Sequence, residues 1–258
     1  MPDEQRRARR GSPETALRTA AVWESVLALV AERQEALGRP LQVLDIGGGT
    51  GGLSVPLAER GHQVTVVDPS PDALAALDRR IAEAGVADRV LAIQGDATTV
   101  SQVCPQLRAD VVCCHGVLEV VDDPQGAVTS LANALAPQGL LSIVVAQRLA
   151  AVVARALAGR FAQARQALSS PDGRWGEADP LPRRFDVAAV EAMLTAAGLV
   201  VVERTGVRVF SDLVPSGFVD TEADRVALLA LEREVAMHPD FAFLGQIGAS
   251  AHVVARRD

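Results

Sequence analysis

Residues 41–70 constrain the fold more than any other part of the chain. An apolar run at 43–46 leads into a glycine turn that begins with Gly47, Gly48 and Gly49, and a second apolar run ends at Asp68. Residues between the turn and the second run have the spacing of an amphipathic helix. A strand, a glycine turn, a helix and a second strand form a unit that brings backbone close to a nucleoside cofactor, with an acid placed for the ribose hydroxyls.

The chain is long enough and apolar enough to bury a complete core. Its 258 residues are 49% hydrophobic, which suits one large α/β domain. No apolar run reaches the length of a membrane span, and residues 1–13 lack the apolar core of a signal peptide. We expect a cytoplasmic protein with a disordered leader at 1–13 and a single domain over 14–258.

Composition excludes several kinds of chemistry. Lysine and tyrosine are both absent, so no reaction can depend on a catalytic lysine or tyrosine. The net charge of −7 gives no support for broad nucleic-acid affinity. Cys104, Cys113 and Cys114 lack the spacing of metal ligands, and no metal site is expected. The last two are neighbours on a predicted strand, which indicates buried free thiols in a reducing compartment.

Apolar runs and helical patterns alternate along most of the chain. Strands are predicted at 42–46, 63–68, 89–94, 109–114, 139–146, 199–210 and 248–256. Helices are predicted at 52–60, 71–84, 97–103 and 124–136, between the first five strands. Strands joined by helical crossovers predict an α/β fold with a doubly wound, mostly parallel seven-stranded sheet. Residues 148–184 break this rhythm with an alanine-rich helical stretch and a proline-broken loop, so we expect a helical cap insertion there.

Three features separate the glycine turn from a dinucleotide site. Asp45 lies two residues before the first glycine, where a dinucleotide site keeps an apolar side chain. The third predicted strand ends at Gly95-Asp96-Ala97, which places a further acid for an adenine amino group. Hydride transfer of the short-chain type would also need the missing tyrosine and lysine. Acids at the ends of three strands instead suit S-adenosylmethionine, which carries a sulfonium cation and no pyrophosphate.

With these motifs the chain resembles the class I S-adenosylmethionine-dependent methyltransferases, which have a Rossmann-like fold. A narrower resemblance is to the tRNA 5-carboxymethoxyuridine carboxyl methyltransferases. It rests on Leu17-Arg18 before Trp23, His115–Glu119 with Asp123-Pro124, Gly159–Phe161, Thr205–Phe210 and Ala227–Glu232. That family carries a lysine-rich run in its cap, where this chain has Ser169–Glu177.

The expected cofactor site combines motif residues with two that only the resemblance implies. The motif residues are Asp45, Gly47, Gly48, Gly49, Asp68, Asp96 and Ala97. Asp68 is expected to bind the ribose rather than cap a helix, whereas Asp45 could equally support the turn. The resemblance implies that Arg18 holds the methionine carboxylate and that His115 contacts the cofactor. The residues alone indicate a solvated charge on a helix for Arg18 and a buried hydrogen-bond donor for His115.

The acceptor side centres on Arg208. It lies on a strand predicted to be mostly buried, where it needs either an internal acid or a substrate carboxylate as partner. A carboxylate acceptor is already ionised and needs no general base. Only His115 and Glu119 are candidates for a general base, and Glu119 is better explained as a residue that supports its loop.

We therefore expect a methyltransferase with Arg208 and His115 as catalytic residues. Its acceptor would be a carboxylate such as that of 5-carboxymethoxyuridine in tRNA. Two alternatives stay open at this point. One is an O-methyltransferase for a small metabolite, which the acidic net charge favours. The other is a non-enzymatic module that binds S-adenosylmethionine.

Overall fold

The computed structural model describes residues 13–258, with side chains described from Val22 onward except that of Ser216. Its strands are β1 (Gln42–Ile46), β2 (Gln63–Asp68), β3 (Val90–Gln94), β4 (Ala109–His115), β5 (Leu135–Ala146), β6 (Leu199–Val207) and β7 (Ser250–Arg257). They form one sheet in the order β3-β2-β1-β4-β5-β7-β6. Among the described strands, β7 alone runs in the direction opposite to the other six. The predicted doubly wound, mostly parallel sheet of seven strands is confirmed.

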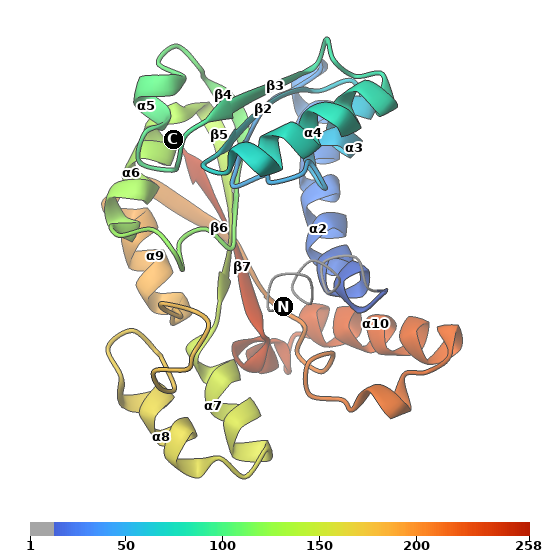
Figure 1. Cartoon of the computed structure of the whole chain (residues 1–258), viewed down its shortest axis with the longest axis vertical. Coiled ribbons are helices and arrows are strands. Elements are labelled where there is room, and N and C mark those ends of the chain that lie inside the picture. Colours follow the sequence, from blue (N-terminus) through green and yellow to red (C-terminus); the bar gives the residue numbers. More distant parts are fainter. Residues whose placement is uncertain (1–12) are drawn as a thin grey trace.

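Helices cover both faces of this sheet (Figure 1). They are α2 (Pro13–Leu37), α3 (Ser54–Glu59), α4 (Pro71–Ala84), α5 (Val100–Val103), α6 (Pro124–Ala134), α7 (Arg148–Leu157), α8 (Phe161–Ser169), α9 (Val187–Ala196) and α10 (Glu222–Met237), with short 3-10 turns η1 (Ser216–Phe218) and η2 (Ala242–Ile247). Val26 of α2 and Leu77 of α4 belong to the core on one face. Leu131 of α6 and Leu194 of α9 belong to the core on the other. Burying a leucine completely contributes about 1.5–3 kcal/mol, so these two layers hold the sheet between them.

Helix caps fix where the crossovers begin. Pro71 opens α4 after Ser70, whose Oγ accepts a hydrogen bond from the backbone N–H of Ala73 at 3.2 Å. Asp123 caps α6 in the same way, accepting from the N–H of Gly126 at 2.9 Å. Side-chain oxygens at these positions satisfy N–H groups that have no partner within the helix. Each crossover therefore starts directly after the loop at the carboxyl end of its strand.

Residues 148–184 contain α7, α8 and the loop that follows them. Both helices lie beyond the end of the sheet where β5 ends and β7 begins, on the opposite side from α3 and α4 (Figure 1). The expectation that this segment is a cap inserted in a single domain over 14–258 stays a prediction. The expected leader at 1–13 lies outside the described residues except for Pro13, where α2 begins.

Two element boundaries differ from the sequence-based expectation. Strand β6 ends at Val207 instead of continuing to residue 210, because Arg208 takes a left-handed conformation with φ of 58°. Helix α5 starts at Val100 rather than at residue 97, because residues 96–99 form a hydrogen-bonded turn around Asp96. Among the described helices, none is both long enough and apolar enough to cross a membrane.

Candidate cofactor and acceptor sites

The carboxyl ends of β1, β2 and β4 bring the predicted cofactor residues to one edge of the sheet. These strands are parallel neighbours, with Ile46 opposite both Val67 and Cys114. The N–H of Gly47 donates to the carbonyl oxygen of Val67 at 2.8 Å, which ties the start of the glycine turn to β2. Asp68 and His115 each follow directly after those partners. In open α/β sheets this edge is where ligands bind.

The glycine turn leaves no room for a side chain at Gly47 or Gly48. Gly47 and Gly49 have φ of 68° and 58°, a region that other residues enter at a cost. A Cβ atom at Gly47 would lie 2.6 Å from Cγ2 of Val117, and one at Gly48 would lie 2.7 Å from Oδ2 of Asp45. The turn is therefore bare backbone that a ligand can approach closely.

Asp68 connects the end of β2 to this turn. Its Oδ2 accepts a hydrogen bond from the N–H of Gly49 at 2.9 Å, and its Oδ1 accepts from the N–H of Ser70 at 2.8 Å. The residue that caps α4 is Ser70, so Asp68 is not the helix cap. Each carboxylate oxygen has a second lone pair, which could accept a ribose hydroxyl.

Asp45 lies beneath the glycine turn. Its side chain is buried and accepts a short hydrogen bond from the hydroxyl of Ser54. Burial raises the pKa of Asp45 to about 6; the Ser54 bond lowers this pKa, and the charge of Asp68 raises it slightly. Of the two roles left open by the sequence, these contacts favour support of the turn.

Asp96 and Ala97 follow β3 at the same edge. Oδ1 of Asp96 accepts from the N–H and the hydroxyl of Thr98 at 2.8 and 2.7 Å, and from the N–H of Thr99 at 3.0 Å. These bonds, led by the Thr98 hydroxyl, lower the pKa of Asp96. All the bonds that the described residues make to this carboxylate go to Oδ1, which leaves Oδ2 for a ligand. Ala97 is completely buried in the core.

Helix α2 lies against the glycine turn. A Cβ atom at Gly52 would be 2.9 Å from the ring of Trp23, so the indole packs directly on the backbone of the turn. Arg18 belongs to the same helix, but its side chain lies outside the described residues. The contact of Trp23 with the turn was not expected from the sequence and is visible only in the packing.

His115 and Glu119 mark the end of β4 and the loop after it. Nε2 of His115 lies 2.9 Å from Oγ of Ser142, and burial lowers the pKa of His115 to about 3, with a smaller contribution from His252. Oε1 of Glu119 accepts from the N–H of Ala146 at 2.6 Å, which joins the loop to the end of β5. This contact agrees with the expected loop-supporting role of Glu119.

A cavity of about 260 Å³ opens beyond the end of β5 and the start of β7. Its lining includes Arg155, Arg184 and Arg208 together with Trp175. Ala146, the last residue of β5, and Ser250, the first residue of β7, also line the cavity. These two residues pair with each other in the sheet. His115 pairs with Val144, two residues before Ala146, so the cavity begins one strand across from His115 and about 7 Å further along the strand direction.

Arg208 reaches this cavity from a turn that α10 holds in place. Its Nη2 lies 3.2 Å from Oδ2 of Asp212, so an internal acid is one of its partners. The buried carboxylate of Glu232 accepts hydrogen bonds from the three N–H groups that follow Arg208, at 2.7–2.9 Å. These bonds offset the energetic cost of the left-handed backbone at Arg208. The sequence had predicted that this residue lies within a strand.

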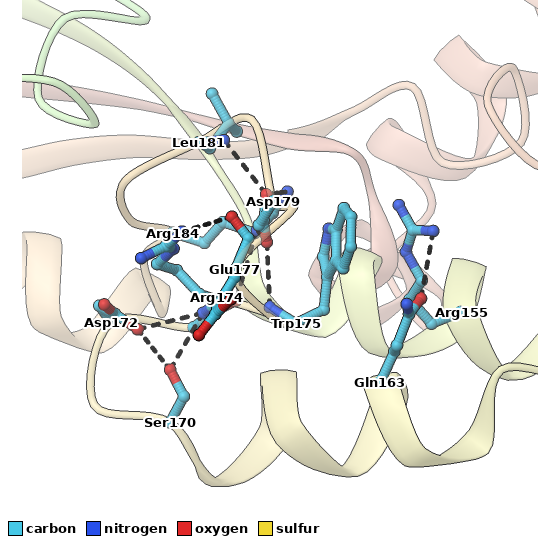
Figure 2. Close-up of polar contacts among 11 residues, drawn as sticks. Arg155, Gln163, Ser170, Asp172, Arg174, Trp175, Glu177, Asp179, Leu181 and Arg184 are labelled. Carbon is cyan, nitrogen blue, oxygen red and sulfur yellow. Dashed lines mark hydrogen bonds and ion pairs between the residues drawn. The ribbon is translucent and has the colours of Figure 1, made fainter.

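The loop at 170–184, which follows α8, is organised around Asp179 (Figure 2), and the side chain of Asp179 is completely buried. Its carboxylate accepts from the N–H groups of Trp175 and Leu181 at 3.0 and 3.1 Å and forms a two-point ion pair with the guanidinium of Arg184. The guanidinium of Arg155 lies 3.8 Å from the ring centroid of Trp175. It donates to the neutral amide of Gln163 at 3.4 Å.

Several of these residues were not singled out from the sequence. They are Ser54, Ser142, Arg155, Trp175, Asp179 and His252. Ser142 and His252 are polar residues within apolar strand runs, and this pattern could have drawn attention to them. The position of Arg155 in an alanine-rich helix gave no comparable signal.

Comparison with known proteins identifies relatives of the whole chain. Residues 17–204 match a family described as "Methyltransferase domain". The chain is 30% identical over 247 residues to the tRNA 5-carboxymethoxyuridine methyltransferase of Escherichia coli K12, covering 96% of this chain and 90% of the relative. It is 38% identical over 109 residues, 42% of this chain and 41% of the relative, to the ubiquinone biosynthesis O-methyltransferase of Bradyrhizobium diazoefficiens.

Among solved structures, the magnesium protoporphyrin IX methyltransferase of Synechocystis PCC 6803 with bound S-adenosylhomocysteine has a similar fold. The TM-score is 0.63 at 16% identity, over 100% of this chain and 94% of that one. The plantazolicin methyltransferase, also solved with S-adenosylhomocysteine, gives 0.60 at 15% identity, over 98% and 89%.

Proposed function

The chain belongs to the S-adenosylmethionine-dependent methyltransferases, and from this premise we propose that it esterifies a carboxylate, that of 5-carboxymethoxyuridine in tRNA. The observation that carries this proposal is the arginine-lined cavity beside the carboxyl ends of the parallel strands. The E. coli relative, which the chain matches over nearly its whole length, bears this substrate in its name.

The residues at the sheet edge fit the cofactor. The glycine turn has positions where a Cβ atom would collide, and Asp68 is held with its carboxylate at the turn. Asp68 would bind the ribose hydroxyls and Asp96 the adenine amino group, while Asp45 keeps the turn in shape. S-adenosylmethionine supplies an electrophilic methyl group, and the protein's task is to align the acceptor with it and to exclude water.

The charge of the cavity suits an acceptor with one negative charge. Two of its arginines have acidic partners, Arg184 with Asp179 and Arg208 with Asp212. Arg155 forms no ion pair with a carboxylate among the described residues and contacts Trp175 and Gln163 instead. The cavity thus retains about one positive charge. An arginine fork binds a carboxylate through two parallel hydrogen bonds, and the neutral ester product would no longer be attracted.

The site offers little general-base chemistry, which also favours a carboxylate. A hydroxyl acceptor must lose a proton, whereas a carboxylate is already ionised at neutral pH. His115 has a pKa lowered to about 3, so it is a weak base, and Glu119, whose pKa is raised by burial, does not line the acceptor cavity. Arg208 and Arg155 would orient the carboxylate, and no residue would need to take a proton.

The cap carries a charge opposite to that of the chain as a whole. Residues 148–184 contain seven arginines and three acids, a net charge of +4 in a chain of −7. Arg160 and Arg165 on the α7–α8 hairpin are exposed. A local basic surface of this size could contact the few phosphates of an anticodon loop without broad nucleic-acid affinity.

A small carboxylic metabolite is the second candidate. The overall charge of −7 and the absence of lysine from the cap favour it over RNA. The cavity chemistry is the same for both, because each acceptor would present a carboxylate to the same arginines.

One labelling experiment separates the candidates. The protein is incubated with methyl-labelled cofactor and with tRNA that lacks the ester, and the product is treated with mild alkali. We expect alkali-labile label on the wobble nucleoside. Label on tRNA that survives alkali would contradict esterification, and label found only on a small acid would assign the activity to a metabolite.

A further inference from the structure

Four polar side chains form a line through the sheet from α2 to the end of β4. They are Ser25, His252, Ser142 and His115. Oγ of Ser25 lies 3.2 Å from Nδ1 of His252. Oγ of Ser142 lies 2.8 Å from Nε2 of His252 and 2.9 Å from Nε2 of His115. The contacts join elements that are up to 227 residues apart in the chain.

Ser142 lies between the two imidazoles because β5 pairs with β4 on one side and with β7 on the other. Ser142 is completely buried and His252 is 1% exposed. Buried hydroxyls and imidazoles are costly unless they are hydrogen-bonded, so the order of donors and acceptors along the line is constrained.

Counting protons shows that the two histidines must hold opposite tautomers. Ser142 has one hydroxyl hydrogen but faces two Nε2 atoms, so it donates to one and must accept from the other. A neutral imidazole carries a proton on one nitrogen only. Both rings are neutral at physiological pH, since burial lowers the pKa of His115 to about 3 and that of His252 to about 4.

Ser25 gives the line its direction. Among the described residues, the Ser25 hydroxyl hydrogen has no acceptor other than Nδ1 of His252, so we assign Ser25 as the donor in this contact. His252 then carries its proton on Nε2 and donates to Ser142. The Ser142 hydroxyl donates in turn to Nε2 of His115, which leaves the proton of His115 on Nδ1.

We propose that Ser25, Ser142 and His252 are positioning residues that hold His115 in the Nδ1–H tautomer. His115 then presents a fixed N–H donor at the edge of the sheet where the cofactor and acceptor sites meet. Nδ1 has no hydrogen-bond partner among the described residues, so it is available to an acceptor atom of a bound ligand. The line also ties this donor to α2, whose Trp23 packs on the glycine turn.

Nitrogen NMR of the imidazole rings tests the proposal in the full chain, with S-adenosylhomocysteine added. The chain has four histidines, and a His238→Gln variant assigns the signal of that partly exposed residue. We expect His115 to be protonated on Nδ1 and His252 on Nε2. Finding His115 protonated on Nε2, or both rings in the same tautomer, would overturn the proposal.

Ser142→Ala removes the link between the rings, and Ser130→Ala is its matched control. The Ser130 hydroxyl is buried without a hydrogen-bond partner among the described residues, so its removal should change neither tautomer. In Ser142→Ala we expect His115 to show a mixture of tautomers, because the hydroxyl that donates to its Nε2 is gone. If that variant does not fold, Ser25→Ala at a partly exposed position provides the same test. If His115 keeps a single Nδ1–H tautomer in the folded variant, the proposed positioning role of the substituted serine is wrong.

Discussion

Oδ2 of Asp68 accepts a hydrogen bond of 2.9 Å from the backbone N–H of Gly49. The acid expected to bind the ribose is thus also the residue that holds the glycine turn against the end of β2. Cofactor binding and the shape of the turn depend on the same carboxylate.

Asp68→Ala should weaken binding of S-adenosylhomocysteine about tenfold to a hundredfold. Loss of hydrogen bonds to a charged acceptor costs about 1.5–3 kcal/mol, and the N–H of Gly49 also loses its partner. Calorimetry measures the effect, with Asp72→Ala as the control because Asp72 is an exposed acid in the first turn of α4. Equal affinities of the two variants would show that Asp68 does not bind the ribose.

Asp45→Asn should stabilise the cofactor-free protein at neutral pH. In the folded state the pKa of Asp45 is raised from 3.8 to about 6. The protonated carboxyl therefore contributes to the free energy of unfolding below pH 3.8, and this contribution is lost as the pH rises through 6. The shift corresponds to about 3 kcal/mol, and an amide still accepts from Ser54 without a charge. Denaturant unfolding at pH 4 and pH 7 should show a gain at pH 7 alone; a loss at pH 7 would contradict the raised pKa.

His252→Gln should make the protein less sensitive to acid. The pKa of His252 falls from 6.5 to about 4 on folding, so the stability it contributes is present above pH 6.5 and lost as pH falls toward 4. That shift is worth about 3 kcal/mol, and an amide does not titrate. Unfolding curves between pH 4 and 7 measure the slope, and His238→Gln, at a partly exposed histidine, serves as the control. An unchanged slope would mean that His252 titrates normally.

The sequence predicted the elements and the cofactor edge because both follow from short-range patterns. Asp68, Gly47–Gly49 and Asp96 each stand at the end of an apolar run, and parallel strands bring such ends together.

The acceptor cavity and the hydrogen-bonded line from Ser25 to His115 could not be predicted in this way. Arg155 and Trp175 meet because α7 and the loop at 170–184 fold back on each other. Ser142 and His252 are 110 residues apart in the chain. Arg208 was assigned to a strand because its neighbours are apolar. Its left-handed backbone depends on Glu232, which no local pattern connects to it.

Glu232→Gln should loosen the turn that presents Arg208. An amide can accept fewer of the N–H bonds that converge on Glu232, and they would no longer be charge-assisted, so we expect a stability loss of about 1–3 kcal/mol. The KM for the acceptor should rise while cofactor affinity is unchanged. Glu234→Gln, an exposed acid on the same helix, is the control. A Glu232 variant with unaltered stability and KM would show that this contact does not position Arg208.

The most direct test of the account is the steady-state kinetics of Arg155→Gln with the methyl-accepting tRNA. Arg155 is the cavity arginine without an acidic ion-pair partner among the described residues, and exposed Arg165→Gln on the same cap is the matched control. Loss of a charge-assisted bond to the carboxylate predicts a kcat/KM lower by about tenfold to a hundredfold, mostly through KM, with unchanged cofactor affinity. Equal kcat/KM values for the two variants would contradict carboxylate recognition by this cavity.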